Sequence, residues 1–276
     1  MPLFSRSDGD LVRDVPNYRR MLQHLGGRTA SQVFFDQEID VTETLERLRK
    51  HNEGATRRVS LFHLVMWGFT RAFHERPRLN RFSAGGRLYQ RRGIHLSYSA
   101  KKAMRDDAPL VAIKREMQPT WTFAEMVEAL GGATDEGRSE KQSSMDKELG
   151  LLTSLPVFLL AFLVALAKWL DGRNLLPRAL TADDPLFASA YVSNMGSLKL
   201  EACHHHLWDY GSIGVFCAIG RAKPVVRKID GELVERQMVT LKYTFDERSE
   251  DGLYCARALD LVRQSVEQPD VLPPLS

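Results

Sequence analysis

The sequence predicts an α/β domain in which helices flank a mixed β-sheet. Strand-like and helix-like segments alternate along the whole chain, Asp230 and Gly231 form a tight hairpin signal, and no repeat of fixed period occurs. The chain has 276 residues, of which 43% are hydrophobic and 26% are charged. This is enough for a substantial core, and we expect a single domain over residues 1–276.

The first elements are a short helix and a long strand. Residues 18–25 have a helical pattern that ends at Gly26 and Gly27, and residues 32–40 read as a strand. Val41, Leu45 and Leu48 then recur at helical spacing.

A longer helix follows, and it is expected to lie in the core. Ser60 is a suitable N-cap, and Pro77 ends the pattern. Its apolar face consists of Leu61, Leu64, Val65, Phe69, Ala72 and Phe73.

Two strands and a capped helix come next. Residues 94–100 alternate strictly, and residues 110–113 form a compact apolar run. Thr122 and Glu125 have the spacing of a capping box. Residues 131–148 are polar and charged, and we expect them to be mobile.

Residues 150–167 contain no charge, which leaves three interpretations open. Eighteen apolar residues approach the length of a membrane-spanning helix, but Pro156 leaves only about eleven clean helical residues after it. The segment 150–170 could therefore span a membrane, lie on or dip into one, or be buried within the protein or an oligomer.

The C-terminal half is rich in strands. Residues 187–194, 212–220 and 238–245 read as strands, and a hairpin turning at Asp230 and Gly231 lies between the last two. A final amphipathic helix begins near Asp251.

Composition limits the compartment and the partners. Cys203, Cys217 and Cys255 are odd in number and widely spaced, so neither a disulfide framework nor a CxxC metal site is expected, and a reducing cytoplasm is the natural compartment. Residues 1–15 contain no signal-peptide core and are expected to be a flexible N-terminus, so export is not predicted.

Residues 57–92 contain nine arginines and a single acid, Glu75. Such a stretch most simply forms a solvated face, although the phosphate of a cofactor or an anionic membrane surface are alternatives. Nucleic acid is not expected as a partner, because no aromatic residues are interleaved with base-reading side chains.

The charged corner TFDERSEDG, residues 244–252, joins the last strand to the last helix. Asp251 is placed to cap the helix, and Gly252 allows another backbone to approach its start. Glu247 and Arg248 are either a solvated ion pair or part of a functional site. Ser193 and Asn194 end a strand before a glycine turn, where a hydroxyl and an amide can face a developing oxyanion.

Several of these segments together resemble the catalytic domains of the 2-oxoacid dehydrogenase acyltransferases, which share their fold with chloramphenicol acetyltransferase. QVFFDQEIDVT resembles the family's early strand and "EVDVT" helix start, and FASAYVSNMGSL is similar to "GTFTISNLG". TFDERSEDG is similar to "SFDHRVVDG". The resemblance covers nearly the whole chain.

The resemblance implies a homotrimer with active sites between subunits, where coenzyme A or acyl-CoA and an acyl acceptor meet. The family's general base is the histidine of DHRxxDG, and Glu247 occupies that position here. The oxyanion donor carries over to Ser193, and the "DG" pair to Asp251 and Gly252. Glu247, Ser193 and Asp251 are thus the candidate catalytic residues, and Asn194 and Arg248 the candidates for binding the cofactor. No metal is expected.

The glutamate at position 247 is the main departure from the family pattern. A thiol with a pKa near 8.5 facing a carboxylate with a pKa near 4.3 leaves a mismatch of about 4 units, or roughly 5.7 kcal/mol. Catalysis therefore requires the Glu247 carboxyl to be buried, which would raise its pKa toward about 6 or 7. His204, His205 and His206 offer three alternatives: a substitute base, a metal site, or loop structure at a subunit interface.

Two functions follow. The first is acyl transfer between acyl-CoA and a hydrophobic acceptor. The second is a catalytically inactive trimer that binds a ligand, membrane or partner. No lipoyl domain or lipoyl attachment is expected, which predicts a stand-alone protein, and residues 131–183 look like an insertion relative to the family. We expect a cytoplasmic protein, membrane-associated if the segment 150–170 contacts lipid.

Overall fold

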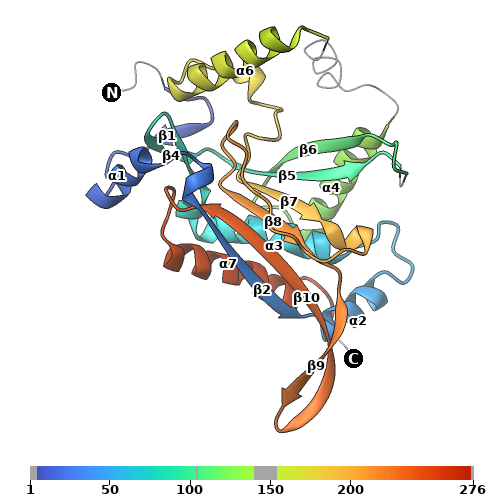
Figure 1. Cartoon of the computed structure of the whole chain (residues 1–276). Coiled ribbons are helices and arrows are strands. Elements are labelled where there is room, and N and C mark those ends of the chain that lie inside the picture. The colour runs from blue at the N-terminus through green and yellow to red at the C-terminus, as the bar shows by residue number, and fades with distance from the viewer. Residues whose placement is uncertain (1–4, 104, 140–153, 275–276) are drawn as a thin grey trace.

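The computed structural model describes residues 5–103, 105–139 and 154–274, and its centre is a mixed seven-stranded sheet (Figure 1). The strand order is β2, β10, β8, β7, β5, β6, with β9 paired to β10. β7 is parallel to both β5 and β8, and the other pairs are antiparallel, which confirms the predicted mixed sheet. The strands are β2 (Gln32–Asp40), β5 (Ile94–Lys101), β6 (Leu110–Met117), β7 (Ala190–Asn194), β8 (Val215–Ile219), β9 (Lys223–Ile229) and β10 (Glu232–Asp246).

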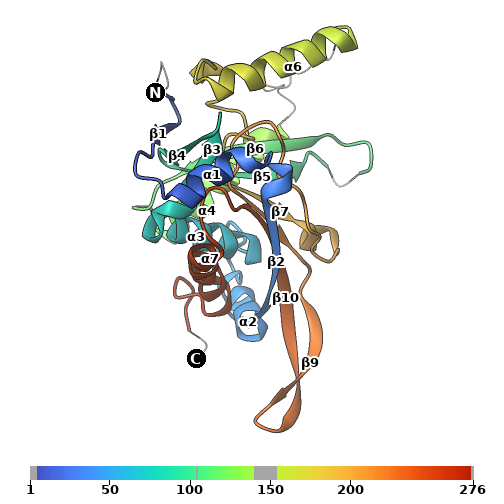
Figure 2. The ribbon, with the colours of Figure 1, turned by 60° about the vertical axis from the view of Figure 1, so that its left-hand side comes forward.

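Helices cover one face of this sheet, as the turned view shows (Figure 2). They are α2 (Thr42–His51), α3 (Leu61–Glu75), α4 (Phe123–Arg138) and α7 (Gly252–Glu267), while α1 (Asn17–Leu25) lies at one end. The predicted core helix is α3, and the side chains of Leu64, Val65 and Phe69 are fully buried. Short 3-10 turns occupy Thr29–Ser31, Pro77–Asn80, Arg178–Leu180 and Met195–Leu198.

The opposite face of the sheet carries no helix in the described ranges. A separate apolar cluster forms there around Tyr191 and Phe216, with Trp208 of the segment 199–214 packed against it. Phe34 of β2 keeps 48% of its surface exposed. This face is therefore only partly covered within one chain.

The β9–β10 hairpin projects away from the body (Figure 1). Asp230 and Gly231 turn it with φ angles of 51° and 93°, the left-handed values that a two-residue hairpin turn requires. β10 is a single strand of 15 residues. It includes both the second strand of the predicted hairpin and the predicted strand 238–245. Its first half pairs with β9, and its second half pairs with β2 and β8.

A small antiparallel sheet corrects the expectation for the N-terminus. β1 (Gly9–Leu11), β4 (Arg87–Arg91) and β3 (Arg81–Ala84) pair side by side, and Arg6 is buried. Residues 1–15 were predicted to be flexible, and this prediction is wrong for the part that contains the paired strand β1. Residues 1–4 lie outside the described ranges.

The polar stretch after residue 130 also differs from its prediction. Residues 131–138 continue α4, because Gly131 packs against the Arg57 guanidinium and Arg57 in turn pairs with Glu128 and Asp135. Residues 140–148, the rest of the segment expected to be mobile, lie outside the described ranges.

Helix α6 (Val157–Gly172) forms from the predicted apolar segment, of which residues 150–153 lie outside the described ranges. Both views place it apart from the sheet, at the end of the molecule opposite the β9–β10 hairpin (Figures 1 and 2). None of its residues is buried. In the part of the chain that the structure describes, no helix combines the length and apolar character needed to cross a membrane.

Candidate functional site

The corner between β10 and α7 is held by a helix cap. The Asp251 carboxylate accepts a hydrogen bond of 2.8 Å from the Tyr254 backbone N–H, so the predicted N-cap is confirmed. This hydrogen bond is the main cause of the lowered pKa of Asp251. Arg19 of α1 lies 3.5 Å from the same carboxylate. The geometry gives Asp251 a structural task at the corner.

Asp246 and Arg248 form a buried bidentate ion pair. Arg248 Nε and Nη2 donate to the two Asp246 carboxylate oxygens over 2.9 and 2.7 Å. Arg28 Nε lies 3.7 Å from the same carboxylate, and burial lowers the pKa of Arg28. Arg248 is predicted to bind the cofactor, but in the single chain its guanidinium faces Asp246.

Glu250 is fully buried, and arginines from three different segments surround it. Arg19, Arg78 and Arg81 lie 2.9, 3.1 and 3.4 Å from its carboxylate oxygens. This cluster was not predicted from the sequence. The sequence does contain its components, because Arg78 and Arg81 belong to the arginine-rich stretch and Glu250 lies in the charged corner. Their proximity, however, depends on the tertiary fold.

Glu247 is fixed through its backbone at both ends of the residue. Its N–H donates to the Ser31 carbonyl over 3.0 Å, and its carbonyl accepts from Arg19 Nη1 over 3.3 Å. Its side chain is partly exposed and makes no hydrogen bond or ion pair within the described ranges. Of the four carboxylates at this corner, Glu247 is therefore the one without a partner among the described residues.

Ser193 and Asn194 end β7, and Ser193 lies on the same, partly covered face of the sheet as Tyr191. Ser193 Oγ lies 3.5 Å from the Met195 sulfur, which is a weak acceptor. The Asn194 side-chain oxygen accepts from the Ser197 backbone N–H over 3.2 Å and caps the following turn. The Ser193 hydroxyl is thus free to donate to a stronger acceptor.

The fold does not bring Ser193 and Glu247 together within one chain. Ser193 is level with Ala218 of β8, and Ala218 is level with Lys242 of β10. Glu247 lies five residues further along that strand direction, which places it about 17 Å away along the strands and about 10 Å across two strand spacings. The two predicted catalytic residues occupy different ends of the sheet surface.

The three histidines lie over the partly covered face, in a segment that runs from the level of Lys242 toward the corner. His205 stacks on Phe216 with ring centroids 4.4 Å apart, and its carbonyl accepts from Thr244 Oγ1 over 2.6 Å. His204 Nε2 lies 2.9 Å from an Asp36 carboxylate oxygen. Leu207 directly follows the three histidines, and its backbone carbonyl accepts a hydrogen bond of 3.3 Å from the side-chain amide of Gln32. Gln32 is next to Ser31, whose carbonyl accepts from the Glu247 N–H. No group of three or more potential metal ligands occurs in the described residues.

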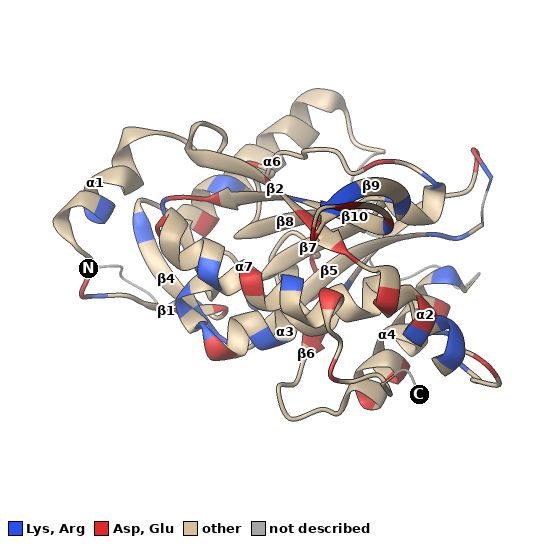
Figure 3. Cartoon of the chain, turned by 90° about the horizontal axis from the view of Figure 1, so that it is seen from below, with Lys and Arg blue, Asp and Glu red and all other residues tan. Residues whose placement is uncertain are grey.

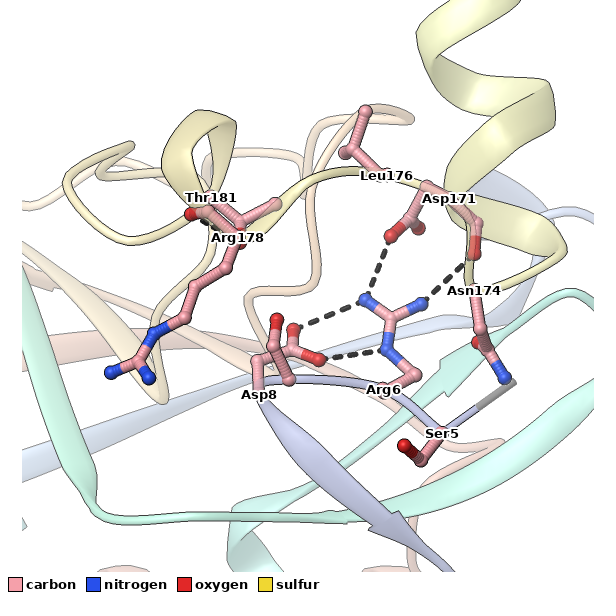
Figure 4. A pocket seen from close by; sticks show the side chains of 9 residues that line it. Ser5, Arg6, Asp8, Asp171, Asn174, Leu176, Arg178 and Thr181 are labelled. Carbon is pink, nitrogen blue, oxygen red and sulfur yellow. Dashed lines mark hydrogen bonds and ion pairs between the residues drawn. The ribbon is translucent and has the colours of Figure 1, made fainter.

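A small polar pocket lies between the N-terminal segment and the end of α6 (Figure 4). Arg6 spans it, with its guanidinium between the carboxylates of Asp8 at 2.8 Å and Asp171 at 2.7 Å. The cavity has a volume of about 80 Å³. Arg6, Asp8 and Asp171 are thus paired with one another, and the Arg6–Asp171 pair fastens the end of α6 to the body.

Most arginines of the stretch 57–92 have acidic partners. Arg57, Arg71 and Arg92 pair at the surface, while Arg78 and Arg81 pair with Glu250. Basic and acidic residues are interspersed along the helices seen from below (Figure 3). This distribution favours the simplest of the predicted interpretations, a set of ordinary ion pairs.

Solved structures with the same architecture define the class of fold. A probable dihydrolipoamide acetyltransferase from Listeria monocytogenes is 14% identical, with a TM-score of 0.61 over 94% of this chain and 95% of that one. The Azotobacter vinelandii dihydrolipoamide acetyltransferase is also 14% identical, with a TM-score of 0.61 over 91% and 86% of the two chains. Chloramphenicol acetyltransferase is 13% identical, with a TM-score of 0.54 over 92% and 93%. The chain therefore has the chloramphenicol acetyltransferase-like fold.

One family model matches the C-terminal part of the chain. Residues 177–273 match the model for the 2-oxoacid dehydrogenases acyltransferase (catalytic domain). This segment contains Ser193, His204, His205, His206 and the whole corner 246–252, and over these residues the resemblance predicted from the sequence is confirmed. No curated protein sequence is a significant match.

Proposed function

We propose that this protein is a coenzyme A-dependent acyltransferase that works as a homotrimer. The observation that carries the proposal is the family match over residues 177–273, a range that contains the unpaired Glu247 carboxylate and the Ser193 hydroxyl, whose partner in the chain is the Met195 sulfur. Acyl-CoA is the proposed donor, and a hydrophobic molecule is the proposed acceptor.

In the proposed reaction, Glu247 accepts the proton of the attacking thiol or hydroxyl as that group adds to the thioester carbonyl carbon. The carbonyl oxygen becomes an oxyanion, to which the Ser193 hydroxyl donates a hydrogen bond. Collapse of the tetrahedral intermediate breaks the bond to coenzyme A, and the leaving thiolate takes the proton back from Glu247.

The separation of Ser193 and Glu247 supports a site between subunits. A neighbouring copy whose Ser193 end faces this copy's corner would bring the two groups together, and its packing would use the partly covered sheet face near Phe34. Such contact would also exclude water from the Glu247 carboxylate, which makes a carboxylate a stronger base. Asp251, the Asp246–Arg248 ion pair and the Glu250 cluster would hold the corner in position.

A second candidate function is a catalytically inactive trimer that binds a ligand or partner. It is favoured by Glu247 itself, because the family pattern has a histidine at that position. If the protein is an enzyme and Glu247 is not its base, His206 is the candidate for that role, because it is exposed and is the member of the triplet next to Leu207, which contacts Gln32 beside the corner.

Release of free thiol from acyl-CoA distinguishes these functions. We expect turnover by the wild type, and a loss of about 10²- to 10⁴-fold in kcat for Glu247→Gln. Ser193→Ala should lose about 10²- to 10³-fold. A wild type no faster than buffer over a series of acyl-CoA chain lengths and acceptors would favour the inactive trimer. A loss with His206→Gln but not with Glu247→Gln would move the base to the histidine loop.

A further inference from the structure

The exposed surface of α6 is almost entirely apolar. Phe158 and Phe162 keep 76% and 60% of their surfaces exposed, and Trp169 keeps 49%. Val157, Val164 and Leu166 are also exposed. Leu175 and Leu180 continue this apolar surface beyond the helix. Apolar exposure of this extent marks a surface that contacts another apolar phase.

Only a narrow stripe of α6 faces the rest of the protein. Its half-buried apolar residues are Leu159, Leu160, Leu163, Ala167 and Leu170. At 3.6 residues per turn, these positions cover an arc of about 100°, so about 260° of the helix circumference points away from the body. A groove of about 420 Å³ runs along part of this outer surface, lined by Val157, Leu160, Ala161, Val164, Ala165 and Lys168.

The width of this arc decides which occupant fits. A second helix or another protein face covers a stripe of roughly 100°, the usual width of an apolar contact face, and would leave more than half of the exposed arc in water. Hydrocarbon chains are a fluid phase, and they can surround all of the side chains that the body does not cover. The geometry therefore favours lipid over a second copy of the chain.

The charges beside the helix are complementary to anionic lipid headgroups. Between residues 155 and 184 the exposed charged side chains are Lys168, Arg173, Arg178 and Asp183, so cations are in excess. Of the other two acids in this range, Asp171 is ion-paired with the buried Arg6, and Asp184 is half-buried and accepts from the Leu186 backbone N–H. Arg173 lies 3.9 Å over the Trp169 ring, so an aromatic ring and a cation mark the polar boundary of the apolar surface.

The last turn of α6 is fixed to the body, which keeps the apolar side chains at the surface. The Arg6–Asp171 ion pair measures 2.7 Å, and Gly85 approaches Gly172 so closely that a Cβ on Gly85 would lie 1.8 Å from the Gly172 oxygen. The helix is about 24 Å long, shorter than the hydrocarbon core of about 30 Å, and suits a position along the membrane surface.

We propose that α6 is a membrane-surface anchor that inserts its outer side chains into an anionic lipid bilayer, with Lys168, Arg173 and Arg178 at the headgroups. The body of the protein supplies the polar side that an interfacial helix normally carries itself. The anchor would hold the acyltransferase site beside membrane-embedded molecules, but it does not depend on catalysis.

Vesicle flotation with the full chain tests this anchor. We expect the wild type to float with phosphatidylcholine vesicles that contain about 30% phosphatidylserine, and to bind pure phosphatidylcholine more weakly. The double variant Phe158→Ser, Phe162→Ser should lose about tenfold or more in binding, because two aromatic side chains no longer enter the hydrocarbon. Lys168→Glu with Arg173→Glu should weaken binding to the anionic vesicles by tenfold or more, and much less to the neutral ones.

A matched control removes exposed apolar side chains elsewhere. Val226 and Leu233 of the β9–β10 hairpin are 60% and 77% exposed, and Val226→Ser with Leu233→Ser should bind vesicles as the wild type does. A wild type that stays unbound, or an unchanged Phe158, Phe162 variant, would overturn the anchor. So would a change in oligomeric mass by light scattering for that variant with no change in flotation, because α6 would then serve subunit contact. Thiol release is measured separately, so failure of either proposal leaves the other testable.

Discussion

The Asp246–Arg248 ion pair determines how the corner beside Glu247 is built. Both residues are buried, with exposed fractions of 1% for Asp246 and 8% for Arg248. The Arg248 guanidinium donates two parallel hydrogen bonds to the Asp246 carboxylate. Such a pair fixes geometry more than it adds stability, because the cost of desolvating both charges offsets their attraction. Breaking it from one side is nevertheless costly, since a buried charge remains.

We expect Arg248→Met to lower the free energy of unfolding by about 3 to 5 kcal/mol, because the Asp246 carboxylate loses its paired charge and keeps only the backbone N–H of residue 248 and the more distant Arg28. Arg49→Met is the matched control: Arg49 pairs with Glu46 and Glu53 at the surface, and its loss should cost less than about 1 kcal/mol. Urea unfolding at neutral pH compares the two variants. Equal losses would show that the corner tolerates an unpaired Asp246.

His63 makes stability depend on pH. It stands at the third position of α3, and its Nδ1 accepts the Ser60 backbone N–H over 3.2 Å, completing a capping box. Burial lowers its pKa from 6.5 to about 4. The unfolded chain thus binds more protons than the folded one between these values, so this contribution is complete above about pH 6.5 and is lost as the pH falls toward about 4.

His63→Gln keeps a side-chain acceptor at the capping position but does not titrate. Between pH 7.5 and pH 4.5 we expect the wild type to lose up to about 3 kcal/mol more than this variant. Thermal unfolding at both pH values measures the difference. Parallel losses in the two proteins would mean that other groups control acid stability.

At the residue scale, the sequence predicted those features that depend on local spacing. The Asp251 cap and the Ser60 and Thr122 helix starts are confirmed, because a cap involves residues three positions apart. The Glu250 cluster was not predictable, since its arginines come from α1, the Pro77–Asn80 turn and β3. The unpaired state of Glu247 likewise depends on which neighbours the fold supplies.

At the element scale, α3 and α7 are packed at the limit of contact. A Cβ added to Gly68 would lie 2.8 Å from the Val262 Cα, closer than two carbon atoms can approach. Gly68 is therefore the residue that sets the spacing of the two helices behind the sheet.

Gly68→Ala should destabilise the protein by about 1 to 3 kcal/mol, because the helices must separate. Gly132→Ala, at an exposed position of α4, is the control: nothing lies within 4 Å of its Cβ position, and alanine should stabilise the helix by about 0.5 to 1 kcal/mol. Denaturant unfolding gives both values. A neutral Gly68→Ala would mean that the α3–α7 contact adjusts freely.

Elements with a strong hydrophobic period were predicted well, and those defined by pairing were not. The strand 32–40 and the helices after Ser60 and Asp251 were expected from their periods. The three short strands of the small sheet show little alternation, and two of them carry arginines, so only their pairing identifies them. α4 continues through a polar, glycine-containing sequence because contacts with Arg57 hold it there.

At the scale of the whole molecule, the sequence predicted the fold because its motifs recur in the family order. It could not predict how far apart the two candidate catalytic residues lie, since that distance depends on strand register. The proposed site between subunits requires an assembly, and we expect a mass of about 94 kDa by light scattering, three times the 31.3 kDa of one chain. A monomer at working concentrations would leave Glu247 without its partner.

Complementation between two inactive variants tests this central claim most directly. Ser193→Ala and Glu247→Gln subunits are refolded together in equal amounts, and thiol release is compared with that of each variant alone. If each site takes Glu247 from one subunit and Ser193 from its neighbour, random mixing restores about a quarter of the wild-type activity. Mixed trimers that remain as inactive as the separate variants, beside an active wild type, would contradict a site shared between subunits.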